Sequence, residues 1–244
     1  MLAFAACAPK PSPLRIAAAA DLRYAMDDLV KAFRERHGEV RVEASYGSSG
    51  TFFAELTNHA PFDLFLSADL QYPHKLAEQG LVLPGSEFTY ATGRIVVWTP
   101  RASAIDLERL GIKALRQPAV HHVAIANPAH APYGRAAEAA LRSLGVYDAV
   151  KDKLVLGENI AQAFQLVQSG AAEAGIVALS LARAPAAAAQ GHYWEVPVDA
   201  YPRIQQGGAI MMWAANPGAA QAFRAFMLAP EGRAILKRYG FSGE

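Results

Sequence analysis

The sequence predicts an α/β fold built as two lobes, and three observations support this prediction. First, from Leu14 onward short apolar runs alternate with segments whose apolar residues recur every three or four positions. This alternation is typical of mostly parallel sheets with helices on both faces. Second, 244 residues, 52% of them hydrophobic, suffice for one large domain or two lobes of roughly 100 residues each. Third, the run "GRIVVWTP", from residue 93, starts a second series of strands and helices.

The first half of the chain contains three predicted strands, each followed by a predicted helix. The strands are "LRIAAAA" (14–20), "VRVEASYG" (40–47) and "FDLFLSA" (62–68). The first helix, within residues 21–38, has the clearest pattern, because its apolar residues keep the spacing of one buried face and Gly38 ends it. The next two helices are expected from about Thr51 and over residues 71–80.

The second half repeats this organisation. Strands are predicted in "HHVAIANP" (121–128) and "AGIVALS" (174–180), and helices over residues 133–145 and 159–170. A strand "GGAIMMWAA" (207–215) and one long helix over residues 218–241 close the chain. The Ala-rich "RAPAAAAQG" is expected to be a surface linker or a helix end.

Composition and motifs argue against several classes of function. With 23 basic and 22 acidic residues the net charge is +1, and no Lys/Arg cluster is visible, so no nucleic-acid partner is predicted. No dinucleotide-binding or P-loop motif is present, and "GSSG" lacks the spacing of a nucleophile elbow. His121 and His122 open a strand, where neighbouring side chains point to opposite faces and cannot chelate one metal. The sequence therefore predicts no enzyme and no cofactor.

Residues 1–12, "MLAFAACAPKPS", are interpreted as the remnant of a signal segment followed by a linker. The stretch "FAAC" resembles a lipoprotein signal, in which Cys7 would be acylated. A cleaved signal peptide with an incidental cysteine and a cytosolic chain are the alternatives. The expectation is a protein carried across the inner membrane into the periplasm, with or without a lipid anchor on Cys7.

Four predicted helices begin directly after a strand, at the turns "AAAADL", "YGSSGT", "NPAHAPYG" and "GENIAQ". The first N–H groups of a helix have no intrahelical acceptor, and the helix dipole makes that end partly positive. Such turns lie at the edge where open α/β sheets bind ligands. Two turns fall in each half, so facing lobes would bring all four to one cleft, where a small oxyanion fits without Arg or Lys. Each turn alone is more often only a capped turn, and Asn159 more often only a cap.

The same segments resemble the periplasmic molybdate/tungstate-binding proteins of ABC importers. The resemblance runs from about Leu14 to Phe241 and rests on "AAAADLRYAMDDL", "YGSSGTFFAEL", "APFDLFLSAD", "YATGRIVVW", "IANPAHAPYG" and "ILKRYGF". It implies a type II periplasmic-binding-protein fold, in which two α/β lobes are joined by two crossover strands and the ligand lies in the cleft. Lobe 1 is then expected over residues 13–92 plus 204–244, and lobe 2 over residues 93–203.

The resemblance also implies the residues that contact the oxyanion. These are Ala20 and Asp21 after the first strand, Ser48 and Ser49 of "GSSG" with Ser49 donating through side chain and backbone, and the backbone N–H groups of Tyr133 and Ile160. The metal would be bound only as its oxyanion, with no direct side-chain ligand. The implied partners are the small oxyanion and an inner-membrane ABC permease, and a monomer is expected.

Two positions depart from the family pattern. Some members have a serine at the first turn and a tyrosine after "GIV", where this chain has Asp21 and Ala178. We expect Asp21 to cap the helix that begins at Leu22, with Arg23 or Arg135 offsetting its charge, because an ionised carboxylate facing a dianion would be strongly repelled. The competing interpretation is a carboxylate that accepts a proton from the ligand, which favours a protonated anion such as hydrogen phosphate.

The sequence as a whole predicts a solute-binding protein that captures molybdate or tungstate and performs no chemistry, with hinge closure between the lobes as the working step. The alternatives are a receptor for another oxyanion, such as sulfate, phosphate or an organic anion, and an enzyme or sensor domain on the same two-lobed frame.

Overall fold

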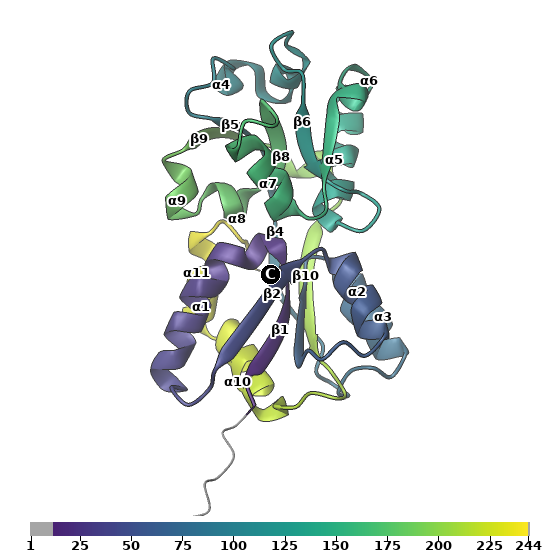
Figure 1. Ribbon diagram of the computed structural model, residues 1–244, viewed down its shortest axis with the longest axis vertical. Coiled ribbons are helices and arrows are strands. Elements are labelled where there is room, and N and C mark those ends of the chain that lie inside the picture. The colour runs from purple at the N-terminus through teal and green to yellow at the C-terminus, as the bar shows by residue number, and fades with distance from the viewer. Residues whose placement is uncertain (1–11, 244) are drawn as a thin grey trace, which may run out of the picture.

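The computed structural model describes residues 12–243, and Cys7 lies outside them. The chain forms two lobes stacked along its long axis, each with one five-stranded sheet (Figure 1). The sheet of lobe 1 has the order β2-β1-β3-β10-β4. Its strands are β1 (Leu14–Ala19), β2 (Val42–Gly47), β3 (Leu64–Ser67), β4 (Phe88–Gly93) and β10 (Ile204–Ile210).

The sheet of lobe 2 has the order β7-β6-β8-β5-β9. Its strands are β5 (Ile95–Pro100), β6 (Val123–Ala126), β7 (Leu154–Gly157), β8 (Ala174–Ala178) and β9 (Gly191–Glu195). The chain passes from lobe 1 to lobe 2 between β4 and β5, where Arg94 alone separates the strands, and returns between β9 and β10. The predicted lobe limits, at residues 92/93 and 203/204, stay a prediction. The strands of the two sheets change over close to these positions, between β4 and β5 and between β9 and β10.

Both sheets are mixed, so the expectation of mostly parallel sheets needs correction. In lobe 1, β1 pairs in parallel with β2 and β3, but β10 runs antiparallel to both β3 and β4. In lobe 2, β6 pairs in parallel with β7 and β8, but β5 runs antiparallel to β8 and β9. In each sheet the reversed strand begins where the chain has just crossed from the other lobe.

Helices cover both faces of the sheet in lobe 1, with α1, α10 and α11 on one side and α2 and α3 on the other (Figure 1). These helices are α1 (Arg23–Arg36), α2 (Ser49–Thr57), α3 (Gln71–Glu78), α10 (Pro217–Leu228) and α11 (Pro230–Arg238). The single helix expected over residues 218–241 is thus two helices. Ala229 adopts an extended conformation (φ −71°, ψ 162°) before Pro230, as residues that precede proline generally do.

Lobe 2 carries two longer helices, α5 (Pro132–Ser143) and α7 (Ile160–Gln168), together with several short ones. The short ones are α4 (Leu107–Leu110), α6 (Tyr147–Val150), α8 (Leu179–Ala182) and α9 (Pro185–Ala188). The 3-10 segments of the molecule are η1 (Ala20–Leu22), η2 (Gly111–Arg116), η3 (Lys151–Lys153) and η4 (Val198–Ala200). Sequence patterns missed these elements because none is long enough to show a helical period; only α9 coincides with an expected helix end.

The buried side chains explain why the lobe 1 strands read as continuous apolar runs. Ile16 and Ala18 of β1 face a large core that includes α1, whereas Ala17 between them faces a smaller core with Phe52 and Leu56 of α2. Successive strand residues point to opposite faces, so a sheet covered on both sides needs apolar residues at every position. This packing fixes the strand ends, and with them the turns that follow.

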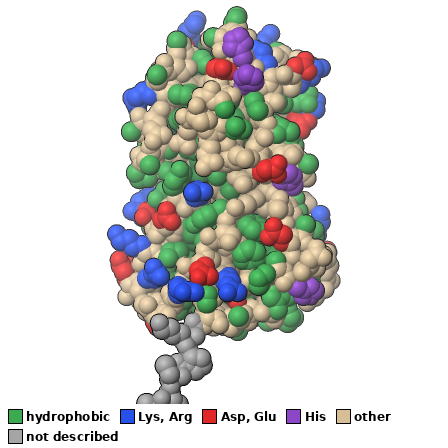
Figure 2. Space-filling model, in the orientation of Figure 1, with side chains coloured by type: hydrophobic (Ala, Val, Ile, Leu, Met, Phe, Trp, Pro, Cys, Tyr) green, Lys and Arg blue, Asp and Glu red, His purple; other side chains and the backbone are tan. Residues whose placement is uncertain are grey.

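The surface bears out the balanced composition. On the face shown in Figure 2, basic and acidic side chains are interspersed and do not gather into one patch. Within residues 12–243, no helix is long and apolar enough to cross a membrane.

Candidate functional site

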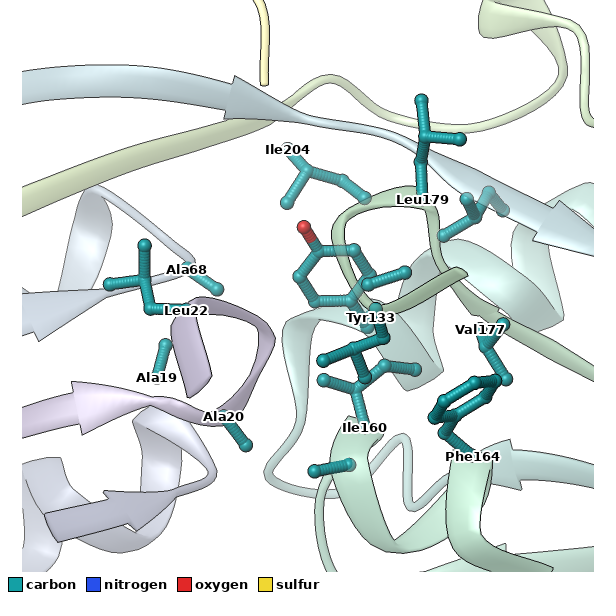
Figure 3. Close-up of a cluster of buried hydrophobic side chains, with 14 of the residues drawn as sticks. Ala19, Ala20, Leu22, Ala68, Tyr133, Ile160, Phe164, Val177, Leu179 and Ile204 are labelled. Atoms are coloured by element: carbon teal, nitrogen blue, oxygen red, sulfur yellow. The ribbon is translucent and has the colours of Figure 1, made fainter. Parts of the chain in front are cut away.

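A small, tightly lined cavity of about 10 Å³ lies between the lobes, where the four strand-to-helix turns meet. All six residues predicted to contact an oxyanion line it, and the other lining residues are small or apolar. Figure 3 shows Ala20, Tyr133 and Ile160 among them. The lining consists of Ala19, Ala20, Asp21, Gly47, Ser48, Ser49 and Ala68 from lobe 1 and Ala131, Pro132, Tyr133 and Ile160 from lobe 2. The expectation that two turns from each lobe converge on one place is therefore met, and no Lys or Arg is among the lining residues.

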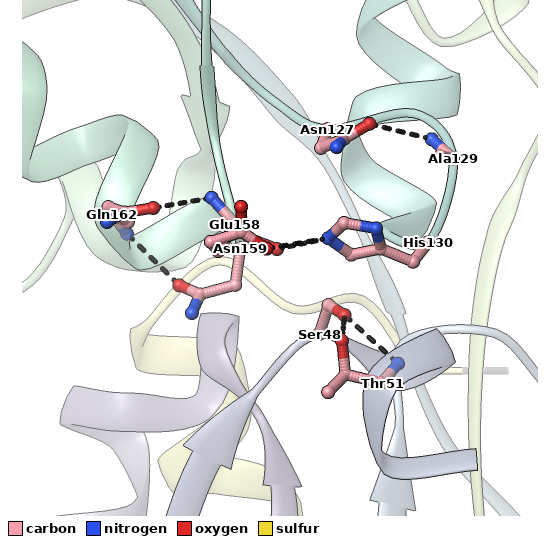
Figure 4. A network of polar contacts seen from close by, with 8 residues as sticks. All are labelled: Ser48, Thr51, Asn127, Ala129, His130, Glu158, Asn159 and Gln162. Atoms are coloured by element: carbon pink, nitrogen blue, oxygen red, sulfur yellow. Dashed lines mark hydrogen bonds and ion pairs between the residues drawn. The ribbon is translucent and has the colours of Figure 1, made fainter. Parts of the chain in front are cut away.

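The two serines of "GSSG" have different roles. Ser48 is the N-cap of α2, because its Oγ accepts a hydrogen bond from the Thr51 N–H (3.2 Å) and lies 2.7 Å from the Thr51 Oγ1 (Figure 4). Ser49 is the first residue of α2, and its buried Oγ accepts from the Ala68 N–H at 2.9 Å. Accepting that bond leaves the hydroxyl hydrogen of Ser49 available to another acceptor. Ser49 can therefore donate to an anion through both its hydroxyl and its N–H.

Lobe 2 contributes helix N-termini. Ile160 is the first residue of α7, and Asn159 caps that helix by accepting from the N–H groups of Ala161 and Gln162, both at 3.0 Å. Asn159 is thus a cap, as expected. Tyr133 is the second residue of α5, so its N–H, like that of Ile160, has no acceptor within its own helix. Backbone N–H groups from α2, α5 and α7 consequently surround the cavity.

Asp21 does not cap α1, and this expectation was wrong. The helix is preceded by η1, its N-cap is Leu22, and no side chain makes a capping bond. The Asp21 carboxylate is buried instead, where its Oδ2 accepts from the Tyr133 hydroxyl (2.8 Å) and from the Gln206 amide. Long-range packing between the lobes overrides the local capping preference.

The two arginines expected to offset the charge of Asp21 lie elsewhere. Arg135 forms an ion pair with Asp69, and the guanidinium of Arg23 lies 5.9 Å from the ring centroid of Tyr46. Burial raises the pKa of Asp21 to about 6, and the hydrogen bonds from Gln206 and Tyr133 oppose this shift. Burial, together with the nearby Asp21 charge, also raises the pKa of Tyr133 well above its usual value, so this phenol stays neutral and donates.

Further polar contacts join the lobes around the cavity. The Gly50 N–H donates to the His130 carbonyl (3.0 Å), and the Ser180 hydroxyl donates to the Asp21 carbonyl (2.8 Å). The His130 ring lies at the rim, 2.9 Å from the Glu158 carbonyl oxygen and opposite Ser48 (Figure 4). Direct contacts between the lobes therefore hold the walls of the cavity together.

The arrangement suits a small tetrahedral anion. Helix N-termini and a hydroxyl supply neutral donors, and such donors bind oxyanions without a basic side chain. No cluster of three or more His, Cys, Asp or Glu that could hold a metal ion occurs within the described part of the chain. The donors lie around one small cavity, and this geometry favours binding of an anion over a chemical reaction on it.

Sequence patterns missed two polar residues of the site, Gln206 and Ser180. Both contact Asp21, yet they lie 185 and 159 positions from it in the chain. Gln206 is a fully buried polar residue in the strand β10, but it precedes the strand predicted from residue 207 and its burial is not visible in the sequence. Ala68 was also missed, although it follows β3 just as the predicted contacts follow β1 and β2.

Two α/β lobes joined by two crossovers, with a small donor-lined cavity between them, define a solute-binding protein. The chain belongs to the bacterial extracellular solute-binding protein family, whose pattern matches residues 14–242. It is 38% identical over 236 residues to the molybdate-binding protein ModA of Azotobacter vinelandii, covering 97% of this chain and 92% of that protein. The identity to ModA of Rhodobacter capsulatus is 37% over 228 residues, covering 93% and 87%.

A solved structure gives the same result for the fold. The periplasmic molybdate-binding protein of Azotobacter vinelandii superimposes with a TM-score of 0.88 at 35% identity, covering 95% of this chain and 99% of that one. The two-lobed α/β fold expected from the resemblance is thus confirmed.

Proposed function

We propose that this protein is the periplasmic receptor of an ABC importer, and that it captures molybdate or tungstate in the cavity between its lobes. The observation that carries the proposal is the meeting of the turns after β1, β2, β6 and β7 at one cavity whose lining contains no Lys or Arg. The names of the related proteins support molybdate as the ligand. Molybdate and tungstate are tetrahedral dianions of nearly equal size, so the proposal covers both.

Within this proposal, Ser49 donates through its hydroxyl and its N–H, and Tyr133 and Ile160 donate through their N–H groups. Ala20, Asp21 and Ser48 complete the wall of the cavity. The protein acts as a monomer that delivers its ligand to a membrane permease and carries out no reaction. Membership of a solute-binding family supports transport.

A panel of anions in a thermal-unfolding assay tests the proposal. A ligand that binds only the folded state stabilises it by RT ln(1 + [L]/Kd), about 4 kcal/mol at a thousandfold excess over Kd. Molybdate and tungstate are expected to raise the melting temperature far more than sulfate, phosphate or chromate. If sulfate or phosphate gave an equal shift, the receptor would belong to another oxyanion.

A second measurement addresses the alternative of an enzyme on the same frame. The anion recovered from the complex after prolonged incubation should be unchanged, at one equivalent per chain. Loss of the bound anion with time would contradict a receptor.

A further inference from the structure

One wall of the cavity holds a buried cluster of polar side chains that has more hydrogen-bond acceptors than donors. The Tyr133 hydroxyl and the Gln206 Nε2 both donate to the Oδ2 of Asp21, and Nε2 also lies 3.0 Å from the Tyr133 oxygen. Two buried acceptors, the Oδ1 of Asp21 and the Oε1 of Gln206, have no hydrogen-bond partner among the described residues. Buried acceptors without a donor are costly. One additional proton in the cluster would supply a donor where acceptors are now in excess.

No positive charge compensates the carboxylate of Asp21. The side chains facing it come from three elements: Tyr133 from α5, Gln206 from β10 and Tyr90 from β4. The backbone N–H groups of Asp21 and Leu22 also lie near the carboxyl, whereas the Ser180 hydroxyl donates to the backbone carbonyl of Asp21. Within residues 12–243, no Lys, Arg or His forms an ion pair with it, since Arg135 pairs with Asp69. Burial raises the pKa of Tyr90 well above its usual value, so both facing tyrosines stay neutral. Asp21 is therefore the group of this cluster that titrates near neutral pH, with a pKa of about 6.

We propose that the receptor takes up one proton with each oxyanion that it binds, and that Asp21 holds this proton at the wall of the cavity. This inference rests on the proposed function, because it requires an oxyanion in that cavity. The proton comes from solvent and bonds to the Oδ1 of Asp21, and the resulting O–H donates to an oxygen of the anion. No bond of the anion breaks, and the proton returns to solvent on release.

The physical reason is the like charge of the two groups. Burial already disfavours the ionised carboxyl, and a dianion within about 4–6 Å disfavours it further. Protonation removes this repulsion and turns an acceptor that faces an anion into a donor. Because coupling between two binding events is reciprocal, an anion that favours the proton is itself favoured by the proton.

The coupling predicts a specific dependence on pH. Above a pKa of about 6 the free receptor has Asp21 ionised, so each binding event must collect a proton. The affinity for the anion should then fall roughly tenfold for each pH unit above that value, until the pKa of the complex is reached. Below about pH 6 the affinity should become independent of pH.

Calorimetry with molybdate measures the proton directly. Titrations at about pH 7.5 in buffers of different ionisation enthalpy give the number of protons taken up, which should approach one for the wild-type protein. Asp21→Asn should take up almost none, because the amide supplies a permanent donor where the protonated carboxyl would be. Asp152→Asn, the same change at an exposed position of η3, should behave like the wild type.

The outcomes separate the two proposals. Molybdate binding by the wild type without proton uptake, or equal uptake by Asp21→Asn, would overturn the inference and leave the proposed function intact. Absence of binding of both molybdate and tungstate at every pH would overturn the proposed function, and the inference with it. If Asp21→Asn does not fold, the proton count and the pH dependence of the wild type alone still decide.

Discussion

The two lobes share one sheet plan but offer different chemistry to the cavity. In both, three strands that run in parallel are followed by one reversed strand and then by a fifth strand that pairs antiparallel with it, in the orders β2-β1-β3-β10-β4 and β7-β6-β8-β5-β9. After β1, the second strand of its sheet, lobe 1 turns at once into η1 and places Asp21 at the wall. After the corresponding β6, lobe 2 inserts residues 127–131 before α5 and brings Tyr133. The sheets thus set where the site lies, and the turns set its chemistry.

The edge strands show the same division. The helices after β2 and β7 are both capped by a polar side chain, Ser48 in lobe 1 and Asn159 in lobe 2. The first residue of the helix differs, because Ser49 has a hydroxyl and Ile160 does not. Both lobes therefore contribute backbone donors, but lobe 1 adds an acid and a side-chain donor, whereas lobe 2 adds the phenol that holds the acid. The predictions below test this asymmetry, from the largest expected effect to the smallest.

Asp21→Asn should stabilise the ligand-free protein at neutral pH. The pKa of Asp21 is raised from 3.8 to about 6 in the folded state, so folding takes up a proton between these values. The cost of burying the charge is absent below pH 3.8 and fully present above about pH 6, so wild-type stability falls as the pH rises through this window. The gain for Asn should reach about 3 kcal/mol at pH 7, at 1.36 kcal/mol per pKa unit. Urea unfolding at about pH 4 and 7 measures it.

The control for this prediction is Asp152→Asn, whose difference from the wild type should not depend on pH. If the free energies of unfolding of Asp21→Asn and the wild type changed with pH in the same way, burial would not disfavour the ionised form of Asp21.

Gly50→Ala should prevent the lobes from closing without harming the fold. A Cβ at this position would lie 2.6 Å from the His130 carbonyl oxygen of lobe 2. If the closed state fell to about 1% of the population, the affinity for molybdate would drop ~100-fold. Gly218→Ala is a matched control, since Gly218 is likewise the second residue of its helix and a Cβ there meets nothing within 4 Å.

Small-angle scattering shows whether the loss comes from closure. Molybdate should reduce the radius of gyration of the wild type and of Gly218→Ala, but not of Gly50→Ala. An unchanged radius in all three, with binding established by calorimetry, would mean that closure is not the working step.

Ser49→Ala should weaken molybdate binding roughly 10- to 150-fold, because a hydrogen bond to a charged group contributes about 1.5–3 kcal/mol. It also removes the acceptor of the Ala68 N–H, so some stability should be lost without ligand. Ser86→Ala is the control, since this buried serine also accepts a backbone N–H, from Ile210, but does not line the cavity. Equal affinities for the two variants would show that the Ser49 hydroxyl does not contact the anion.

Much of this site could be predicted from local sequence. The rest could not, because it depends on contacts between residues that lie far apart in the chain. Helix N-termini after strands are local features, so the turns of Ser49 and Ile160 could be placed at the cavity from short patterns. The break at Ala229 has a local cause as well, the proline that follows it, but the helix was predicted as continuous. The hydrogen-bond partners of Asp21 could not be predicted, because Tyr133 and Gln206 lie 112 and 185 residues away in the chain. Their hydrogen bonds outweigh the local preference of an aspartate to cap a helix.

Removing the helix caps should give the smallest effect, and it tests whether Ser48 in lobe 1 and Asn159 in lobe 2 have the same structural role. Ser48→Ala and Asn159→Ala should each lower the free energy of unfolding by about 0.5–2 kcal/mol, since each removes a side-chain acceptor from helix N–H groups. Asn216→Ala, which removes the cap of α10 away from the cavity, sets the reference value. Because the Ser48 Oγ is engaged with Thr51, its loss should change the molybdate affinity far less than the loss of the Ser49 hydroxyl. If calorimetry instead found the two serine variants equally weakened, Ser48 would donate to the anion as well, and lobe 1 would supply two hydroxyl donors where lobe 2 supplies none.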